Sequence, residues 1–423
     1  MLKWIKLAFR NILRNKRRSL VTIMAIGVGF AAISLYHGYI YDAYEELRWF
    51  AICGEEGGYG HLRINKAGWR ENGKLEPEKY MFSKEETGKI TGLLREEKGV
   101  ILASPQTQIL GLVSNGQTSA VFIAQGVVPK DEKFIEKFWF AKVGFIPDGY
   151  TTALIGERLS EEKNSGVLMA KDLADYLNMK PGGGGVVMLQ TLVGQTNAMD
   201  VQVSGVYDTG NDFSNDKFMR FNFDFTQSLL DTQSTERILV LLADWKETER
   251  MRAHLLKKFR NAGIDCEIRT WNELSMIYPN LKSFLDTIFV FVSSIVLVIV
   301  ITTIINTMGM SILERTREIG TLRALGLKRK GVSHLFALEG AVMGLCGSIC
   351  GVVLHTFVWI LLRFFPLKYI PPGFSVPVDM RVAMVPWALF VLLLCLILLS
   401  TIAAILPARQ AAKKNIVDAL GHT

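Results

Sequence analysis

The chain has few of the patterns that carry chemistry. Its 423 residues include no GxxxxGK[ST] loop, no HExxH and no CxxC. The first absence argues against a nucleotide-phosphate site in this sequence, and the other two leave metal binding without support. The glycine-rich run 182–185 has no lysine to hold a phosphate and is typical of a turn. We therefore predict no catalytic residue, no metal site and no cofactor bound by the chain itself.

Charge is missing from four long stretches. Each is longer than the roughly 20 residues that cross the hydrocarbon core of a bilayer. The stretches are Ser19–Tyr41, Thr287–Leu313, Gly340–Leu362 and Val382–Ala408. The rest of the chain is polar, so the mean hydropathy of the whole sequence is only +0.24. We predict a membrane protein with four transmembrane α-helices, at 19–41, 283–313, 331–362 and 382–408, and a large extracytoplasmic α/β domain between the first two.

The distribution of lysine and arginine predicts the orientation of the chain in the membrane. The net charge is +8, and lysine and arginine gather before the first span, at 314–330 and in the tail 409–423. The loop 363–381 has only Lys368 between its flanking arginines. Basic residues favour the cytoplasmic side, so we expect both termini there and residues 42–282 outside. Because the excess charge lies beside the spans, it does not indicate a nucleic-acid partner.

Residues 1–18 are expected to form an amphipathic helix on the inner leaflet. One face of the helix is basic and the other is apolar. The basic face has Lys3, Lys6, Arg10, Arg14 and Arg17, and the apolar face has Leu2, Ile5, Phe9 and Ile12.

The outer region 42–282 predicts an α/β fold with an inserted β-rich subdomain at about 105–228. Ser83 and Glu86 form the capping box of a helix. Asn115-Gly116 between two apolar runs predicts a hairpin. Residues 168–179 are interpreted as a helix. A disulfide between Cys53 and Cys266 is one open alternative, and two free thiols are the other.

A short charged segment lies between the second and third spans. In Glu314–Gly326 the residues Ile312, Thr316, Ile319, Leu322 and either Leu325 or Gly326 recur at spacings of three and four, as on one helix face. Arg315, Arg317, Glu318 and Arg323 are expected on the remaining surface. Gly320 and Gly326 allow close approach or a helix end. The segment is either a loop that only fixes topology or a helix that moves with a soluble partner.

The third span has a stripe of small residues, Gly340, Gly344, Gly347 and Gly351. Such a stripe lets helices approach closely, within one subunit or between two. Glu339 precedes the stripe near the inner end of the span. We favour packing or hinge support for Glu339 over a proton relay.

Three segments together resemble one family. ERTREIGTLRALGLKRKG followed by LEGAVMGLCGSICG, from Glu314 onward, is similar to the signature of MacB/FtsX-like permeases of ABC transporters. Leu7–Ala31 is similar to the family's opening and Leu406–Leu420 to its closing stretch, with Ile416 where the family usually has proline. The order of one span, a large outer domain and three spans agrees.

The resemblance implies a mechanism. In the family, the segment matching Glu314–Gly326 is a coupling helix in a cleft of an ATPase subunit. ATP and Mg would be bound by two copies of that partner, and a second permease copy or a paralogue would complete the complex. Movement would then pass to the periplasmic domains. The implied location is the bacterial inner membrane.

Shorter motifs in the outer region resemble the lipoprotein-releasing (Lol-type) branch. They are Ala124–Val127 with Pro129, Ser204–Gly210 followed by Asp216, and Trp271 with Leu274. They favour extraction of lipoproteins or other lipidated cargo. The alternatives are mechanotransmission to a periplasmic adaptor for efflux and a non-transporting regulator of a cell-wall enzyme. A structural anchor is a more distant alternative.

Overall fold

A computed structural model describes residues 10, 11, 14, 16–54, 58–73, 75–143 and 155–413. The chain divides into two compact units. The membrane unit comprises 1–43, 282–367 and 380–423, and the sheet domain comprises 44–281 with 368–379. Most of the expected amphipathic helix 1–18 and the tail beyond 413 lie outside the described residues.

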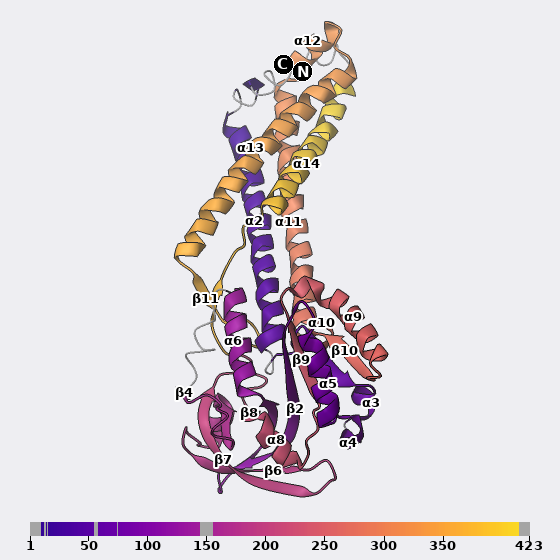
Figure 1. Ribbon diagram of the computed structural model, residues 1–423. Coiled ribbons are helices and arrows are strands. Elements are labelled where there is room, and N and C mark those ends of the chain that lie inside the picture. The colour runs from indigo at the N-terminus through magenta and orange to yellow at the C-terminus, as the bar shows by residue number, and fades with distance from the viewer. Residues whose placement is uncertain are drawn as a thin grey trace. The chain divides into compact units, whose positions relative to one another are not determined.

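Four long helices make up the membrane unit. They are α2 (Lys16–Trp49), α11 (Ile277–Glu314), α13 (Arg329–Phe364) and α14 (Pro386–Lys413). A short helix, α12 (Thr316–Ala324), connects α11 to α13. The four long helices are long and apolar enough to cross a membrane. Figure 1 shows α13 and α14 side by side. The predicted class, four membrane helices plus a large folded domain, is confirmed.

Apolar side chains cover much of the outside of this bundle. Phe291 is 65% exposed, Val353 64% and Leu398 61%. Exposed apolar surface on this scale marks a membrane-facing protein rather than a soluble one. These side chains therefore face lipid.

Two glycines of α13 make room for α2. A Cβ added at Gly347 would lie 2.6 Å from Cβ of Ile26, and one added at Gly351 would lie 2.5 Å from Cβ of Phe30. Real Cβ atoms do not approach so closely. The glycines therefore bring the two helices together, and Ile26 and Phe30 become completely buried.

The other two glycines of the stripe face α14. A Cβ at Gly340 would lie 2.6 Å from Cβ of Ala404, and one at Gly344 would lie 2.8 Å from Oγ of Ser400. All four glycines thus face helices of the same chain. The stripe divides between two neighbours rather than forming one uniform surface.

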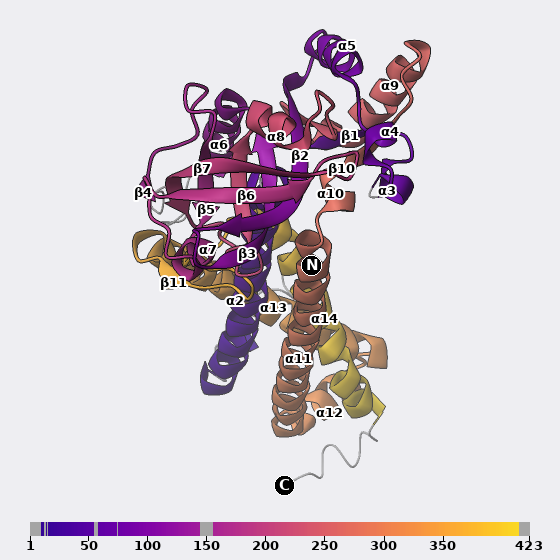
Figure 2. The ribbon, with the colours of Figure 1, turned by 90° about the horizontal axis from the view of Figure 1, so that it is seen from below.

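The sheet domain is built on ten strands. In sheet order the main path is β10-β1-β9-β2-β3-β8-β5-β7-β4, and β6 pairs with both β2 and β7. The strands are β1 Leu62–Lys66, β2 Val100–Ser114, β3 Ser119–Val127, β4 Ile155–Gly156, β5 Gly166–Ala170, β6 Gly184–Gln190, β7 Thr196–Tyr207, β8 Phe218–Asn222, β9 Arg237–Leu242 and β10 Cys266–Thr270. Figure 2 shows β6 and β7 side by side.

Helices fill the connections of the sheet domain. They are the π-helical turn Phe50–Gly54, α3 Trp69–Asn72, α4 Pro77–Tyr80, α5 Lys84–Arg95, α6 Pro129–Val143, α7 Lys171–Tyr176, α8 Phe223–Leu230, the 3-10 turn Trp245–Glu247, α9 Thr248–Asn261 and α10 Trp271–Leu274. A two-stranded ribbon, β11 (Leu367–Tyr369) with β12 (Val378–Met380), lies between α13 and α14 in the sequence.

The long strand β2 joins the two halves of the sheet. Residues 100–106 pair with β9, whereas residues 107–114 pair with β3. The change of partner lies close to position 105, where the sequence analysis places the start of the insertion. Strand β9 is buried along its whole length because both its faces are covered. Ile238 contributes to one apolar cluster and Leu239 to another.

Some local elements predicted from the sequence agree with the structure and one does not. Ser83 and Glu86 form the reciprocal capping box of α5, and Asn115-Gly116 forms the turn of the β2–β3 hairpin with Gly116 at φ +89°. The single helix expected over 168–179 is wrong. Strand β5 occupies the first part and α7 follows it. All five residues of β5 are buried between β7 and β8, where periodicity does not separate a strand from a helix.

Cys53 and Cys266 are both free thiols, so the disulfide alternative finds no support. Cys53 lies in the cluster around Phe50 and Trp139. Burial raises the pKa of the Cys53 thiol, and burial with the neighbouring Asp265 and Glu267 raises that of Cys266 to about 12. Both are therefore uncharged at neutral pH and behave as small apolar groups.

The close contact at Gly351 gives a test of the packing. Gly351→Ala places a methyl group against Phe30 and should destabilise the membrane unit by about 1–3 kcal/mol. Gly309→Ala in α11 is the matched control, because nothing lies within 4 Å of its added Cβ. That change should be neutral or slightly stabilising. Unfolding in mixed micelles measures both, and equal effects would contradict the assigned contact.

Candidate functional site: the short helix between two membrane helices

The charged segment between α11 and α13 is a separate short helix. Arg315 interrupts the helical path with φ −106° and ψ 13°, and α12 begins at the next residue. The hydroxyl of Thr316 donates to the carbonyl oxygens of Ile312 and Leu313 at 3.1 and 2.9 Å. The Arg315 N–H also donates to the Ile312 carbonyl at 3.2 Å, so backbone and side chain together close the end of α11. Figure 1 shows α12 at the junction of the two longer helices.

A glycine ends α12. Gly326 has φ +97°, a left-handed conformation that favours glycine. Leu327 N–H donates to the Leu322 carbonyl at 3.0 Å, and Gly326 N–H donates to the Arg323 carbonyl at 3.0 Å. This pair of bonds is the Schellman arrangement, which turns the chain sharply into α13.

An ion pair inside the chain fixes the start of α12. Arg315 Nη1 donates to both carboxylate oxygens of Glu339 at 3.0 and 3.3 Å, and its Nε donates to Glu318 at 3.2 Å. The side chains of Arg315 and Glu339 are only 11% and 4% exposed. The Arg315 guanidinium also lies 5.6 Å from the ring centre of Phe336. The α11–α12 corner is thus tied to α13 by a nearly buried charge pair.

The start of α2 and the residues before it contribute three further partners. Asn11 Nδ2 donates to Glu339 at 2.6 Å, and Arg14 pairs with Glu318 at 2.9 Å. Arg18 pairs with Glu314. Arg14, assisted by Arg315, holds the pKa of Glu318 below its usual range, so this carboxylate stays ionised at neutral pH. The network therefore joins three segments that are far apart in the sequence.

The two faces of α12 differ. Thr316, Ile319 and Gly320 are buried, and Ile319 belongs to the apolar core of the membrane unit. Leu322 is 40% exposed and Leu325 is 80% exposed. An apolar outer face on a helix at the end of a bundle is suited to bind another protein.

This arrangement corrects two expectations from the sequence. Leu322 and Leu325 do not share the buried face of Ile319, since the helix restarts at Thr316 and ends at Ala324. Arg315 does not lie on the surface for a partner's carboxylate, because Glu339 and Glu318 already bind it. Arg317 remains exposed, and Arg323 is intermediate.

The sequence analysis did not identify Asn11, Arg14 and Arg18 as partners of this site. The sequence pattern placed Arg14 on the basic face of a helix near the membrane and gave Arg18 no role in a site. Nothing in the sequence connects them to acids about 300 residues later. Glu339 is held by Arg315 and Asn11, which agrees with hinge support for α13.

Comparison with known proteins identifies the part of the chain that holds this site. Residues 290–416 match the family described as FtsX-like permease C-terminal. This match supports the resemblance to MacB/FtsX-like permeases. The matched region contains all of α12, α13 and α14, with most of α11.

The similar proteins include one named as a permease and others named as combined ATP-binding/permease proteins. An uncharacterised ABC transporter permease of Methanocaldococcus jannaschii is 31% identical over 176 residues, which is 41% of this chain and 42% of that protein. The macrolide export ATP-binding/permease protein MacB of Escherichia coli K12 is 34% identical over 119 residues, 28% of this chain and 17% of MacB. MacB 1 of Yersinia pestis is 32% identical over the same length, with the same coverage. The chain thus matches less than half the length of each.

Solved structures also resemble the chain. The periplasmic region of MacB from Actinobacillus actinomycetemcomitans matches 50% of this chain and 89% of that chain at 16% identity, with a TM-score of 0.35. The extracellular domain of the transporter YknZ from Gram-positive bacteria matches 49% of this chain and 99% of that chain at 12% identity, with a TM-score of 0.33.

The Arg315–Glu339 pair can be tested by a double-mutant cycle. Arg315→Met and Glu339→Leu should each destabilise the membrane unit by about 3 kcal/mol, because each removes the nearly buried ionic partner of a nearly buried charge. The double variant should recover most of that loss. Unfolding in mixed micelles gives the coupling energy.

The control for this cycle is the pair between Arg18 and Glu314, whose side chains are 44% and 41% exposed. Arg18→Met should cost less than about 1 kcal/mol. Strictly additive effects of Arg315→Met and Glu339→Leu would show that the pair does not fix the corner.

Proposed function

We propose that the chain is the permease subunit of an ABC transporter and that α12 is the helix that couples it to an ATPase. The observation that supports this most directly is a short helix with an exposed leucine face, anchored to α13 by a buried ion pair. A helix held in this way transmits a push from a soluble partner into the membrane helices. The match of residues 290–416 to the FtsX-like permease C-terminal family supports the same role.

Under this proposal, ATP hydrolysis takes place on a partner. The sequence contains no phosphate-binding loop of the GxxxxGK[ST] type. Two copies of an ATPase subunit would bind ATP and Mg, and a second permease copy or a paralogue would complete the assembly. The chain itself would bind neither nucleotide nor metal.

The helix α11 provides the path for movement. It extends without a break from the sheet-domain residues before 282 to Glu314, next to α12. Its 38 residues correspond to about 57 Å of helix. We propose that displacement of α12 passes along α11 to the sheet domain, with that domain in the periplasm and both termini in the cytoplasm of a bacterial cell. The protein would lie in the inner membrane.

The cargo we favour is a lipoprotein or another lipidated molecule. This follows from the resemblance of Ala124–Val127 with Pro129, and of Ser204–Gly210, to the Lol-type branch. Efflux through a periplasmic adaptor is the second candidate, since MacB proteins at 32–34% identity are named for macrolide export. A regulator of a cell-wall enzyme without transport is the third. Identification of the chains that co-purify from native membranes separates them, as lipoproteins, an adaptor or a hydrolase.

Charge on the exposed face of α12 tests the coupling role. Leu325→Glu should leave the fold intact, because this side chain is 80% exposed. It should lower ATPase association at least about tenfold, since a carboxylate loses hydration when it is buried in an interface. Quantitative co-purification from membranes measures the effect.

Leu75→Glu is the matched control, because Leu75 is 82% exposed and lies in the sheet domain. It should leave ATPase association unchanged. Full association of the Leu325→Glu variant would exclude α12 as the coupling element, whereas the family assignment would stand.

A further inference from the structure

A groove lies between α13 and α14, at the end of the membrane unit that also holds α12. Its volume is about 700 Å³. The residues along it come from the first half of α13 and the last half of α14. This volume is within the range of small-molecule sites, about 300–1,000 Å³.

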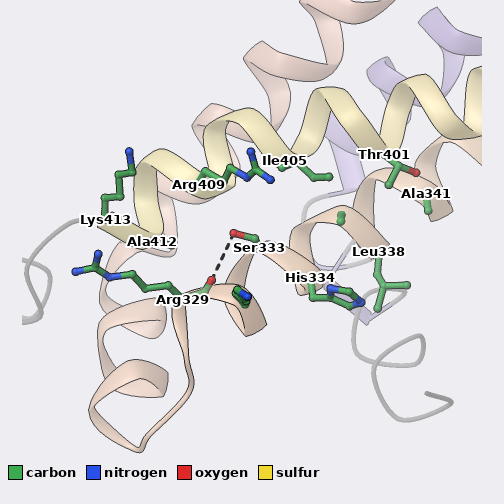
Figure 3. Close-up of a pocket in the computed structure, with 12 residues that line it drawn as sticks. Arg329, Ser333, His334, Leu338, Ala341, Thr401, Ile405, Arg409, Ala412 and Lys413 are labelled. Atoms are coloured by element: carbon green, nitrogen blue, oxygen red, sulfur yellow. Dashed lines mark hydrogen bonds between the residues drawn. The ribbon is translucent and has the colours of Figure 1, made fainter.

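One end of the groove is basic. Arg329 and Lys330 come from α13, and Arg409 and Lys413 come from α14. Figure 3 shows Arg329 facing the segment of α14 that contains Arg409 and Lys413. No carboxylate lines the groove, and among the described residues none forms an ion pair with these four. Four positive charges thus gather at one opening without a compensating acid from the described part of the chain.

The other end of the groove is apolar. Ala337, Leu338 and Ala341 of α13 face Ile405 of α14 there, with Thr401 beyond it. From Arg329 to Ala341 the helix rises about 18 Å. The charge-free stretch of α13 starts at Gly340, and that of α14 ends at Ala408. The groove therefore passes from the membrane surface into the hydrocarbon region.

We propose that this groove binds an anionic phospholipid. The four basic side chains would hold its phosphate and headgroup, and the Ala337–Ala341 end would hold the first part of an acyl chain. Clustered lysine and arginine between membrane helices attract anionic headgroups, each by a modest amount. Arginine is well suited to phosphate because its guanidinium can donate two parallel hydrogen bonds. A free anion would use only the basic end and would leave the apolar end unfilled.

The groove would give such a lipid a position next to the coupling helix. Its lining starts at Arg329, three residues after Gly326 ends α12. A bound lipid would bridge α13 and α14 where they receive α12. The proposal depends on the membrane position of the chain and not on the proposed transport activity.

The test is lipid retention by the full chain, measured by native mass spectrometry. The purified protein is titrated in detergent with phosphatidylglycerol, with phosphatidylcholine of the same chain length, or with inorganic phosphate. We expect preferential binding of phosphatidylglycerol. Removal of two charges in the double variant R329Q/R409Q should weaken that binding about 30-fold.

Two further variants separate a built site from general surface charge. R10Q/R17Q removes the same charge from two exposed arginines outside the groove, one before α2 and one in its first turn, and should weaken binding much less than R329Q/R409Q. Ala341→Trp fills the apolar end and keeps every charge, so it should weaken phosphatidylglycerol binding without affecting inorganic phosphate. Thermal unfolding of each variant confirms that it is folded.

Three results of the lipid titration would overturn the proposal. One is equal binding of phosphatidylglycerol and phosphatidylcholine. Another is equal loss in R329Q/R409Q and R10Q/R17Q, which would show membrane-surface attraction without a site. The last is full phosphatidylglycerol binding by Ala341→Trp, which would show that no acyl chain enters the groove. Loss of ATPase association in R329Q/R409Q with unchanged lipid retention would assign the groove to a protein partner instead.

Discussion

The ion pair between Arg315 and Glu339 is the interaction on which the arrangement of the candidate site depends. It joins the corner between α11 and α12 to α13, and it is largely shielded from water. A buried pair of this kind adds little net stability compared with apolar packing, but breaking one half of it is costly. Its consequence is therefore geometric. The ion pair constrains how α11, the short helix α12 and α13 are placed relative to one another.

Close packing within the membrane unit also holds α13 in place. Glycines at 347 and 351 let α13 approach α2, and those at 340 and 344 let it approach α14. Helix α13 is thus in close contact on two sides, and its Glu339 is held by Arg315 and Asn11. Under the proposed function, a displacement of α12 would act on α13 through this ion pair and on α11 through the chain itself. Closely packed helices transmit such a displacement because their interfaces do not deform continuously.

Much of this could be predicted from the sequence, for a physical reason. Hydrocarbon excludes charge, so the four spans appear as stretches without charged residues. Local hydrogen bonds act over three or four residues, so the capping box at Ser83 and the turn at Asn115-Gly116 were predictable as well. The failures share a different cause. A fully buried segment such as 166–170 has no periodicity, and its state depends on strands β7 and β8 that lie elsewhere in the sequence.

At the candidate site, too, contacts between distant segments could not be predicted from the sequence. The sequence placed a helix between two spans and a glutamate at the start of the third. It did not connect Arg315 with Glu339, nor Arg14 with Glu318, because these contacts are made only when distant helices pack. Ile319 is buried whereas Leu322 and Leu325 are exposed, and this difference depends on where the helix restarts. Such details require the tertiary structure, and they decide which residues of α12 are left for a partner.

The central claim is that the exposed face of α12 contacts an ATPase. The most direct measurement is photo-crosslinking in native membranes with a photoreactive amino acid at position 322, on that face. The account predicts a cross-linked product that contains an ATP-binding subunit, and no such product when the same group replaces Leu75. A reactive group at position 322 that captures only lipid, in membranes where the ATPase is present and assembled, would contradict the claim.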